Sequence, residues 1–458
     1  MKRNLALLTG VIAFVLLFYR QGIAINFSIF GLLLWILLFS VTQAKHRTKT
    51  FWLLSAAVFV SAAGNAWYSD FASFVPLFFS LLILGFKAMF PRLNIVTFPV
   101  AMFCSYVSSP FRMLFIKNWL GVSKNAYTNF WSKLFSYLVI PALFVSVFLV
   151  LYSMASDKFA SYLAIDWNFN VLQIIFLTCL GFFLMFNYFH LIAPKILLKG
   201  NPYLQDDFSA DRHRLSSGSH VLLNMNFQRK SGEITLLLLN LVLCFFIFVY
   251  ATESNIAPEV SYSSEVHERV YVLITSIVIA VAIIMIWFYA PANFSKEARL
   301  LKLLSYVWIT LNAVLVMIAI LKTGEYVGHY GLTFKRVGVY AFLTLCLAGL
   351  VVTSYKLMFI KTNIYLLNRM FWVFFAAMLV GLNINWSWVV TKYNIAHQKT
   401  DIAYLSSLKY NKKIMFDTFG NNPLQCSSCP TITERIQRQQ EKPLLSRSLY
   451  YHFITVEK

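Results

Sequence analysis

The sequence has few charged residues and few of the signatures of known enzymes. Asp, Glu, Lys and Arg make up 12% of its 458 residues, against roughly 25% in soluble domains. Only 17 residues are glycine, which argues against a glycine-rich phosphate-binding loop. The sequence contains no Walker A, GxGxxG, HExxH, GxSxG or EF-hand motif. The low charge, taken with the apolar content described next, excludes a disordered protein, a collagen-like fibre and an ordinary soluble enzyme.

Apolar residues are abundant instead. They make up 59% of the chain, aromatic residues make up 17%, and the mean hydropathy is +0.66. One soluble core cannot hide that much apolar surface, because a polar shell must still be built around it. The composition therefore predicts an all-α polytopic membrane protein, since the apolar stretches are continuous rather than alternating as in a transmembrane barrel.

About eleven stretches are long and apolar enough to cross a membrane as helices. They cover residues 4–19, 22–42, 51–69, 71–90, 135–155, 170–193, 233–252, 270–290, 303–321, 338–357 and 365–388. Asp70 marks the turn of the second hairpin. No small-x-small cleavage site follows the first stretch, so we expect a retained helix rather than a signal peptide. Residues 93–117 contain Pro99 and Pro110 and are either re-entrant or, as we favour, an interfacial amphipathic helix.

The distribution of charge predicts the topology. The net charge is +21. With the N-terminus inside, 23 of the 39 Lys and Arg fall on the cytoplasmic side, 6 in outer loops and 10 after residue 388. This is the positive-inside pattern, so the excess charge indicates a membrane orientation and anionic lipid headgroups rather than nucleic acid. We predict four parts: residues 1–92 (two helical hairpins), 93–134 (a cytoplasmic interfacial segment), 135–388 (a seven-span bundle) and 389–458 (an extracytoplasmic tail).

The tail carries the one clustered pair of cysteines. Cys426 and Cys429 form a CSSC sequence, which favours a disulfide or a free pair over redox exchange or a metal site. For the rest of the tail we expect one helix on the outer membrane face and then looser structure. No cofactor is expected.

Polar residues that could bind a ligand concentrate on the predicted outer face. The candidate cluster consists of His267, Glu268, Glu325, His329, Tyr330, Thr333, Arg336 and Asn394. His and carboxylate groups in such a cluster could bind a ligand or act as acid and base, whereas helix capping would be a purely structural role. Within the spans we expect Asn240 and Asn312 to bond between helices and Lys356 to reach the interface. We expect the loop 194–232, with Asp206 and Asp207, to be solvated.

Several stretches resemble a bacterial family of polytopic membrane proteins known only as a domain of unknown function, numbered four-one-seven-three and related to four-one-five-three. They are RKSGEITLLLLN (Arg229–Asn240), VHERVYVLITSI (Val266–Ile277), LSYVWITLN (Leu304–Asn312), YGLTFKRVGVY (Tyr330–Tyr340), the NINW to YN region (Asn383–Asn394) and PALFVSVFLVLYSMASDKF (Pro141–Phe159). The resemblance covers about residues 135–405 and implies a multi-pass protein of the bacterial inner membrane. It transfers no activity.

Three classes of function remain open. The first is a non-catalytic scaffold, sensor or assembly factor that binds a protein partner through the outer loops and the tail. The second is a transporter or flippase for a small molecule or lipid, with a cavity among the last five spans. The third is a membrane enzyme that uses the outer-face His and acidic residues. The sequence favours the first.

Overall fold

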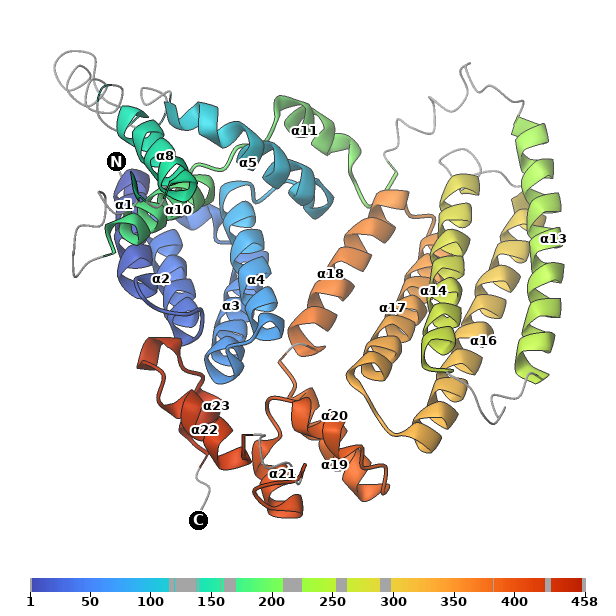
Figure 1. The fold of residues 1–458 in the computed structure, drawn as a ribbon. Coiled ribbons are helices and arrows are strands. Elements are labelled where there is room, and N and C mark those ends of the chain that lie inside the picture. The colour runs from blue at the N-terminus through green and yellow to red at the C-terminus, as the bar shows by residue number, and fades with distance from the viewer. Residues whose placement is uncertain are drawn as a thin grey trace. The chain divides into compact units, whose positions relative to one another are not determined.

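The computed structural model describes residues 2–114, 119, 137, 140–156, 158–159, 170–208, 225–252, 262–288, 298–381, 383–424 and 430–454, without the side chains of 143, 150, 225, 226, 228 and 262–274. Within these ranges the regular elements are all helices (Figure 1). The chain divides into two compact units. The first contains residues 1–93, 97–198 and 442–449, and the second contains 94–96, 199–441 and 450–458.

The first unit is built around two helical hairpins. Its helices are α1 (Lys2–Phe18), α2 (Ile25–Val41), α3 (Lys49–Tyr68), α4 (Phe71–Met89), α5 (Phe98–Leu114), α8 (Ile140–Ala155) and α10 (Val171–Phe189), with short turns η1 (Ala44–His46) and η6 (Leu444–Ser446). Asp70 begins α4 with a capping box, in which its Oδ1 accepts from the Ser73 backbone N–H at 2.9 Å. This confirms the turn predicted there. Helix α1 packs against α2 and α10, and α3 packs against α2 and α4.

The second unit holds the longest helices. They are α13 (Met225–Thr252), α14 (Tyr262–Trp287), α16 (Arg299–Tyr330), α17 (Phe334–Met358) and α18 (Asn363–Gly381). Leu236, Ile284, Trp308, Leu315 and Leu350 are among the buried side chains of a core that α13, α14, α16 and α17 share. The Asn240 amide donates to the Leu304 carbonyl at 3.0 Å, which is the expected bond between helices, whereas Asn312 bonds to Trp308 within its own helix.

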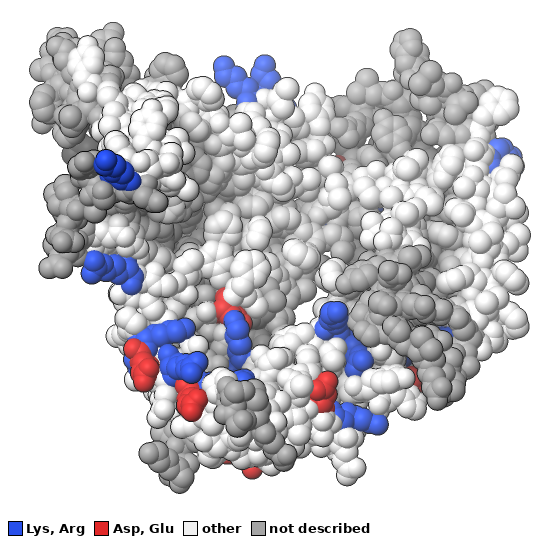
Figure 2. Space-filling view, in the orientation of Figure 1, with Lys and Arg blue, Asp and Glu red and all other residues white. Residues whose placement is uncertain are grey.

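Shorter helices follow in the tail. They are α19 (Trp386–Ala396), α20 (Ile402–Ser407), α21 (Lys412–Phe419), α22 (Ile432–Gln440) and α23 (Leu449–His452); α11 (Lys195–Gly200), η2 (Ile95–Thr97) and η4 (Asn201–Tyr203) lie earlier in the chain. On the face seen in Figure 2, charged side chains gather over the tail helices, while the described surface of the long helices is largely uncharged.

Among the described residues, seven helices are long and apolar enough to cross a membrane: α3, α4, α10, α13 (over Arg229–Thr252), α16, α17 and α18. Ile25–Val41, Ile140–Ala155 and Thr275–Trp287 are shorter apolar helices. Together with α1, these helices coincide with the eleven predicted stretches. The chain therefore has the helices of a multi-pass membrane protein, whereas the count of eleven crossings stays a prediction.

The last of these helices is shorter than its predicted stretch. Helix α18 ends at Gly381 rather than at residue 388, and α19 begins after Asn385, whose side chain accepts from the Trp388 backbone N–H at 3.0 Å. Asparagine stabilises a helix start by satisfying such a free N–H group. The apolar run through Trp386 and Val389 therefore belongs to a separate helix of the tail.

In the described part of the segment between the second hairpin and α8, α5 is an amphipathic helix. Ala101, Ser105 and Ser109 are buried, while the helix exposes Phe103, Val107 and Phe111. Pro99 lies in the first turn, where no intrahelical N–H bond is lost, and Pro110 lies in the last turns. Two prolines are thus compatible with a helix of this length.

The tail is more ordered than the sequence suggested. Leu405, Met415, Ile432 and Ile436 of three successive helices are all buried. Thr431 and Glu434 form a capping box at the start of α22, so the expectation of loose structure after the first tail helix is wrong for the described residues. A small core and capped ends are sufficient to order short helices that would be marginal in isolation.

Candidate functional site

The turn between α16 and α17 and the helix ends beside it hold three residues of the predicted outer-face cluster: Tyr330, Thr333 and Arg336. Thr333 caps α17 with its hydroxyl, which accepts from the Arg336 backbone N–H at 3.4 Å. Gly331 has a φ of +80°, a conformation that favours glycine because it has no Cβ. This geometry explains the YGLT sequence: the glycine turns the chain and the threonine restarts a helix.

Asn394 of α19 binds this turn through both atoms of its amide. Its Oδ1 accepts from the Leu332 backbone N–H at 2.6 Å, and its Nδ2 donates to the Leu332 carbonyl at 2.8 Å. The side chain is 4% exposed. A β-carbon on Gly331 would lie 2.7 Å from Asn394 Oδ1, so the close approach also requires glycine.

Arg336 closes the turn from the other side. Its Nη1 donates to the carbonyls of Tyr330, at 3.0 Å, and of Gly331. Its guanidinium lies over the Tyr326 ring, 4.4 Å from the centroid, where the negative face of the ring attracts a cation. We call the set of Gly331, Leu332, Arg336 and Asn394 the turn clamp.

Tyr404 of α20 adds a third contact between the tail and the turn. Its hydroxyl oxygen accepts from the Phe334 backbone N–H at 2.9 Å. Burial is the main cause that raises the pKa of this phenol, and the bond from Phe334 opposes it. The Tyr404 phenol therefore stays protonated at neutral pH, and its hydrogen bond with Phe334 is kept.

The remaining predicted site residues do not join the clamp. Glu325 and His329 are exposed on the last turns of α16. The side chains of His267 and Glu268 lie outside the described residues, and so do Cys426 and Cys429. Among the described side chains, no three His, Cys, Asp or Glu are grouped as metal ligands. The clamp uses Arg336 and Asn394 as structural donors and acceptors.

An open groove of about 370 Å³ lies in the tail. Its walls come from α19, α21 and the chain end at α23, and the lining residues are Asn385, Trp388, Asn411, Lys413, Ile414, Asp417, Tyr450 and Ile454. Trp388 is 44% exposed. Concave sites of this volume with aromatic walls and a few polar groups are typical binding sites.

One atom at the base of this groove is unsatisfied. Asn411 donates from Nδ2 to Thr391 Oγ1 and to the Leu405 carbonyl, both at 2.8 Å. Because a carbonyl only accepts, the amide nitrogen must face Leu405, and the buried atom without a partner is therefore Oδ1. Sequence analysis missed the groove, since its walls lie up to 69 residues apart and no motif marks them.

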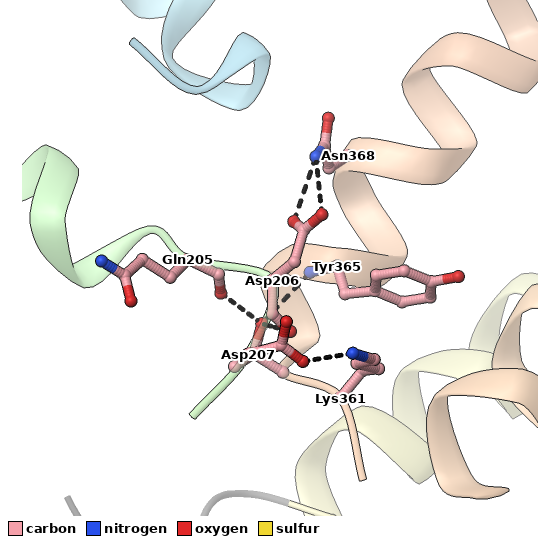
Figure 3. A network of polar contacts seen from close by, with 7 residues as sticks. Gln205, Asp206, Asp207, Lys361, Tyr365 and Asn368 are labelled. Carbon is pink, nitrogen blue, oxygen red and sulfur yellow. Dashed lines mark hydrogen bonds and ion pairs between the residues drawn. The ribbon is translucent and has the colours of Figure 1, made fainter. Parts of the chain in front are cut away.

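A second polar network lies at the turn between α17 and α18 (Figure 3). The Thr362 hydroxyl donates to the Gln205 carbonyl at 2.7 Å, and the Thr362 N–H donates to the Asp206 carbonyl at 3.1 Å. Asn368 of α18 donates to the Asp206 carboxylate at 3.0 Å. Lys361 pairs with Asp207, and that bond raises the pKa of Lys361.

This network corrects in part the expectation that the loop carrying Asp206 and Asp207 is solvated. Gln205 and Asp207 are exposed, but residues 205–207 are also bonded to a turn more than 150 residues away in sequence. A second correction concerns Lys356, which does not reach the interface. Its side chain is 0% exposed within α17, and its Nζ has no hydrogen-bond partner.

These features describe an all-helical protein with the helices of a multi-pass membrane bundle and a folded tail clamped to one of its turns. The chain belongs to the family described as a domain of unknown function (DUF4153), whose model matches residues 48–414. This match confirms the resemblance, for the related family four-one-five-three. It also extends the matching region from about residue 135 back to residue 48. Comparison with the curated proteins gave no match. Comparison with the solved structures gave none either.

Proposed function

We propose that this protein is a non-catalytic scaffold or assembly factor of the bacterial cytoplasmic membrane, with eleven spans, a cytoplasmic N-terminus and an external tail that binds a partner. The observation that carries the proposal is the folded tail. It is fastened to the α16–α17 turn by Asn394 and Tyr404, and it presents an open groove. Exposed Glu325 and His329 beside that turn extend the proposed binding surface.

Contacts between loops support this topology. Two loops that touch must lie on the same side of a membrane, so the chain between them crosses an even number of times. The Asn94 backbone N–H donates to Asn201 Oδ1 at 2.9 Å. Helices α5, α8 and α10 lie between these residues. If α8 and α10 both cross, α5 does not, which supports a segment on the cytoplasmic face.

A longer interval gives the same result. The Gly22 backbone N–H donates to Ser446 Oγ at 2.8 Å, and Ser446 donates to Gln21 at 2.6 Å. Ten of the eleven predicted spans lie between these residues, and an eleventh crossing by α5 would make the number odd. The contact therefore supports a C-terminal tail on the same side as the first loop, which the positive-inside pattern puts outside.

The orientation is tested by labelling cysteines in intact spheroplasts after mild reduction. An impermeant maleimide is expected to label Cys426 or Cys429 from outside. A variant in which both are serine, with a cysteine at exposed Thr418 of α21, repeats the measurement at a second tail position. Labelling of either position only after the membrane is opened would overturn the external tail.

Partner binding is tested by photo-crosslinking in living cells. A benzoylphenylalanine at Trp388, in the groove, is expected to form an adduct of one defined mass with a protein of the same membrane or its outer side. The matched control is the same amino acid at Trp52, which is 52% exposed on α3. Identical adducts from both positions, or none from Trp388, would refute a binding role for the groove.

One observation favours transport as a second candidate function. Lys356 is an ionisable residue buried in α17 without a hydrogen-bond partner, and such residues mark ion or substrate paths in membrane bundles. Transport predicts that Lys356→Met fails to complement a strain without the gene although the variant is inserted normally. The scaffold proposal predicts that Lys356→Met complements, whereas Trp388→Ala does not.

A further inference from the structure

Two basic side chains in the tail point at the same backbone carbonyl. Lys412 of α21 donates from Nζ to the Ser406 carbonyl at 2.8 Å, and Arg435 of α22 donates from Nη1 to the same oxygen at 3.0 Å. Lys412 is 5% exposed. Among the described residues, neither cation has a carboxylate within salt-bridge distance. Buried Lys412 and half-buried Arg435 therefore meet at one oxygen without an opposite charge among the described residues.

Unused hydrogen-bond donors surround the same place. The Ser406 hydroxyl is buried and has no partner. An ammonium group has three donors and a guanidinium five. Of these, Lys412 uses one for Ser406, and Arg435 uses one for Ser406 and one for the Pro430 carbonyl. Several N–H and O–H donors of Lys412, Arg435 and Ser406 therefore make no hydrogen bond to a described residue.

A small cavity opens between these groups. Its volume is about 10 Å³, and its polar lining consists of Ser406, Lys412, Arg435 and Asn422. The apolar lining consists of Met415, Pro423, Leu424, Pro430 and Ile432. A space of that size holds about one water-sized particle. Phosphate, sulfate and carboxylate groups are too large for it, whereas a single halide ion fits with a small expansion.

The electrostatics favour an anion over a water molecule. Burial, and secondly the charge of Arg435, lower the pKa of Lys412 to about 8. Lys412 is therefore still mostly protonated at neutral pH, and the cost of burying it beside Arg435 remains. A water molecule could accept hydrogen bonds from both groups but would leave that charge uncompensated.

We propose that Ser406, Lys412 and Arg435 form a binding site for one chloride ion, which joins α20, α21 and α22. The bound ion accepts from the Ser406 hydroxyl and from both cations. Because it holds three tail helices together, its binding stabilises the folded tail. The proposal is independent of any partner in the groove, since the cavity and the groove share no lining residue.

The test uses full-length protein in nanodiscs of neutral lipid, with sodium chloride replaced by sodium gluconate at constant ionic strength. The readout is the rate at which a protease cleaves the tail. Chloride at ten times its dissociation constant is expected to slow cleavage about tenfold. Chloride binds only the folded tail, so the population of the open, cleavable tail falls roughly in proportion to the chloride concentration. Equal rates in both salts would overturn the proposal, since that result indicates water or simple screening.

Two variants make the result specific. Lys412→Met is expected to abolish the difference between chloride and gluconate. The matched control is Lys409→Met, an exposed lysine between α20 and α21 that lines neither the cavity nor the groove, which is expected to retain it. A chloride effect that persists in Lys412→Met would refute the site. If that variant does not fold, broadening of the chloride NMR signal by wild-type protein decides, and an unbroadened signal counts against the proposal.

Discussion

Replacing Asn394 by alanine removes the one side chain that satisfies both backbone groups of Leu332. The variant loses bonds of 2.6 and 2.8 Å. A backbone group left unpaired in a buried place costs about 1–3 kcal/mol. Leu332 is only half-buried, so water reaches part of the vacated space and the lower end of the range applies to each group. We expect a loss of about 2 kcal/mol in the local stability of the clamp.

Hydrogen–deuterium exchange of the full-length protein in nanodiscs measures this loss directly. A local destabilisation of about 2 kcal/mol raises the population of the open state about thirtyfold. The backbone amides of α19 and of the Leu332 turn are therefore expected to exchange about thirty times faster in Asn394→Ala. Exchange in α1 to α4 should be unchanged, because the two lost bonds join Asn394 to Leu332 and involve none of those helices.

Thr418→Ala serves as the matched control. Thr418 is exposed on α21, and its hydroxyl bonds only to the Ile414 carbonyl of its own helix. Such surface substitutions usually change stability by less than about 0.5 kcal/mol. If Asn394→Ala accelerates exchange no more than Thr418→Ala does, the clamp does not hold the tail, and the reasoning from hydrogen-bond geometry is refuted.

Three further predictions use the same preparation. Gly331→Ala is expected to accelerate exchange at the turn at least tenfold. Alanine is strained at a φ of +80°, and its β-carbon would lie only 2.7 Å from Asn394 Oδ1. Unchanged exchange would contradict this prediction. Asp206→Ala should loosen the first turns of α18 more than Asp207→Ala, which removes an exposed ion pair that water screens, and the reverse order would count against the network. Lys412 has a pKa of about 8 when folded and 10.5 when unfolded, so the unfolded tail binds more protons between these values and protease resistance rises with pH across that window. In gluconate, Lys412→Met is expected to abolish this rise, and a rise that persists in the variant would show that another group causes it.

Local signals in the sequence were sufficient where one segment determines its own structure. The helices were located because a continuous apolar run of about 20 residues has few alternatives to a helix. The Asp70 turn was found because its capping residue is adjacent to the helix that it starts. The capping box of Thr431 and Glu434 was equally readable, and it should have prevented the expectation of loose structure.

The errors came from residues whose partners are distant in sequence. Asp206 looked solvated because it stands in a charged loop, yet its partner Asn368 lies 162 residues further on. Lys356 was expected to reach water because it is near a helix end, and only the packing of neighbouring helices decides that it does not. No periodicity or motif carries either fact.

Composition and hydropathy by themselves determined the class of this protein, an all-helical chain with many apolar helices, and short sequence stretches indicated its family, DUF4153. They suffice because the bilayer selects helices by length and apolarity alone. Only the tertiary structure decided how the polar residues are used. It made Arg336 and Asn394 a clamp, and it brought Lys412 to Arg435 and Trp388 to Tyr450. Those pairings depend on how short helices pack, and packing joins residues that are not neighbours in the chain.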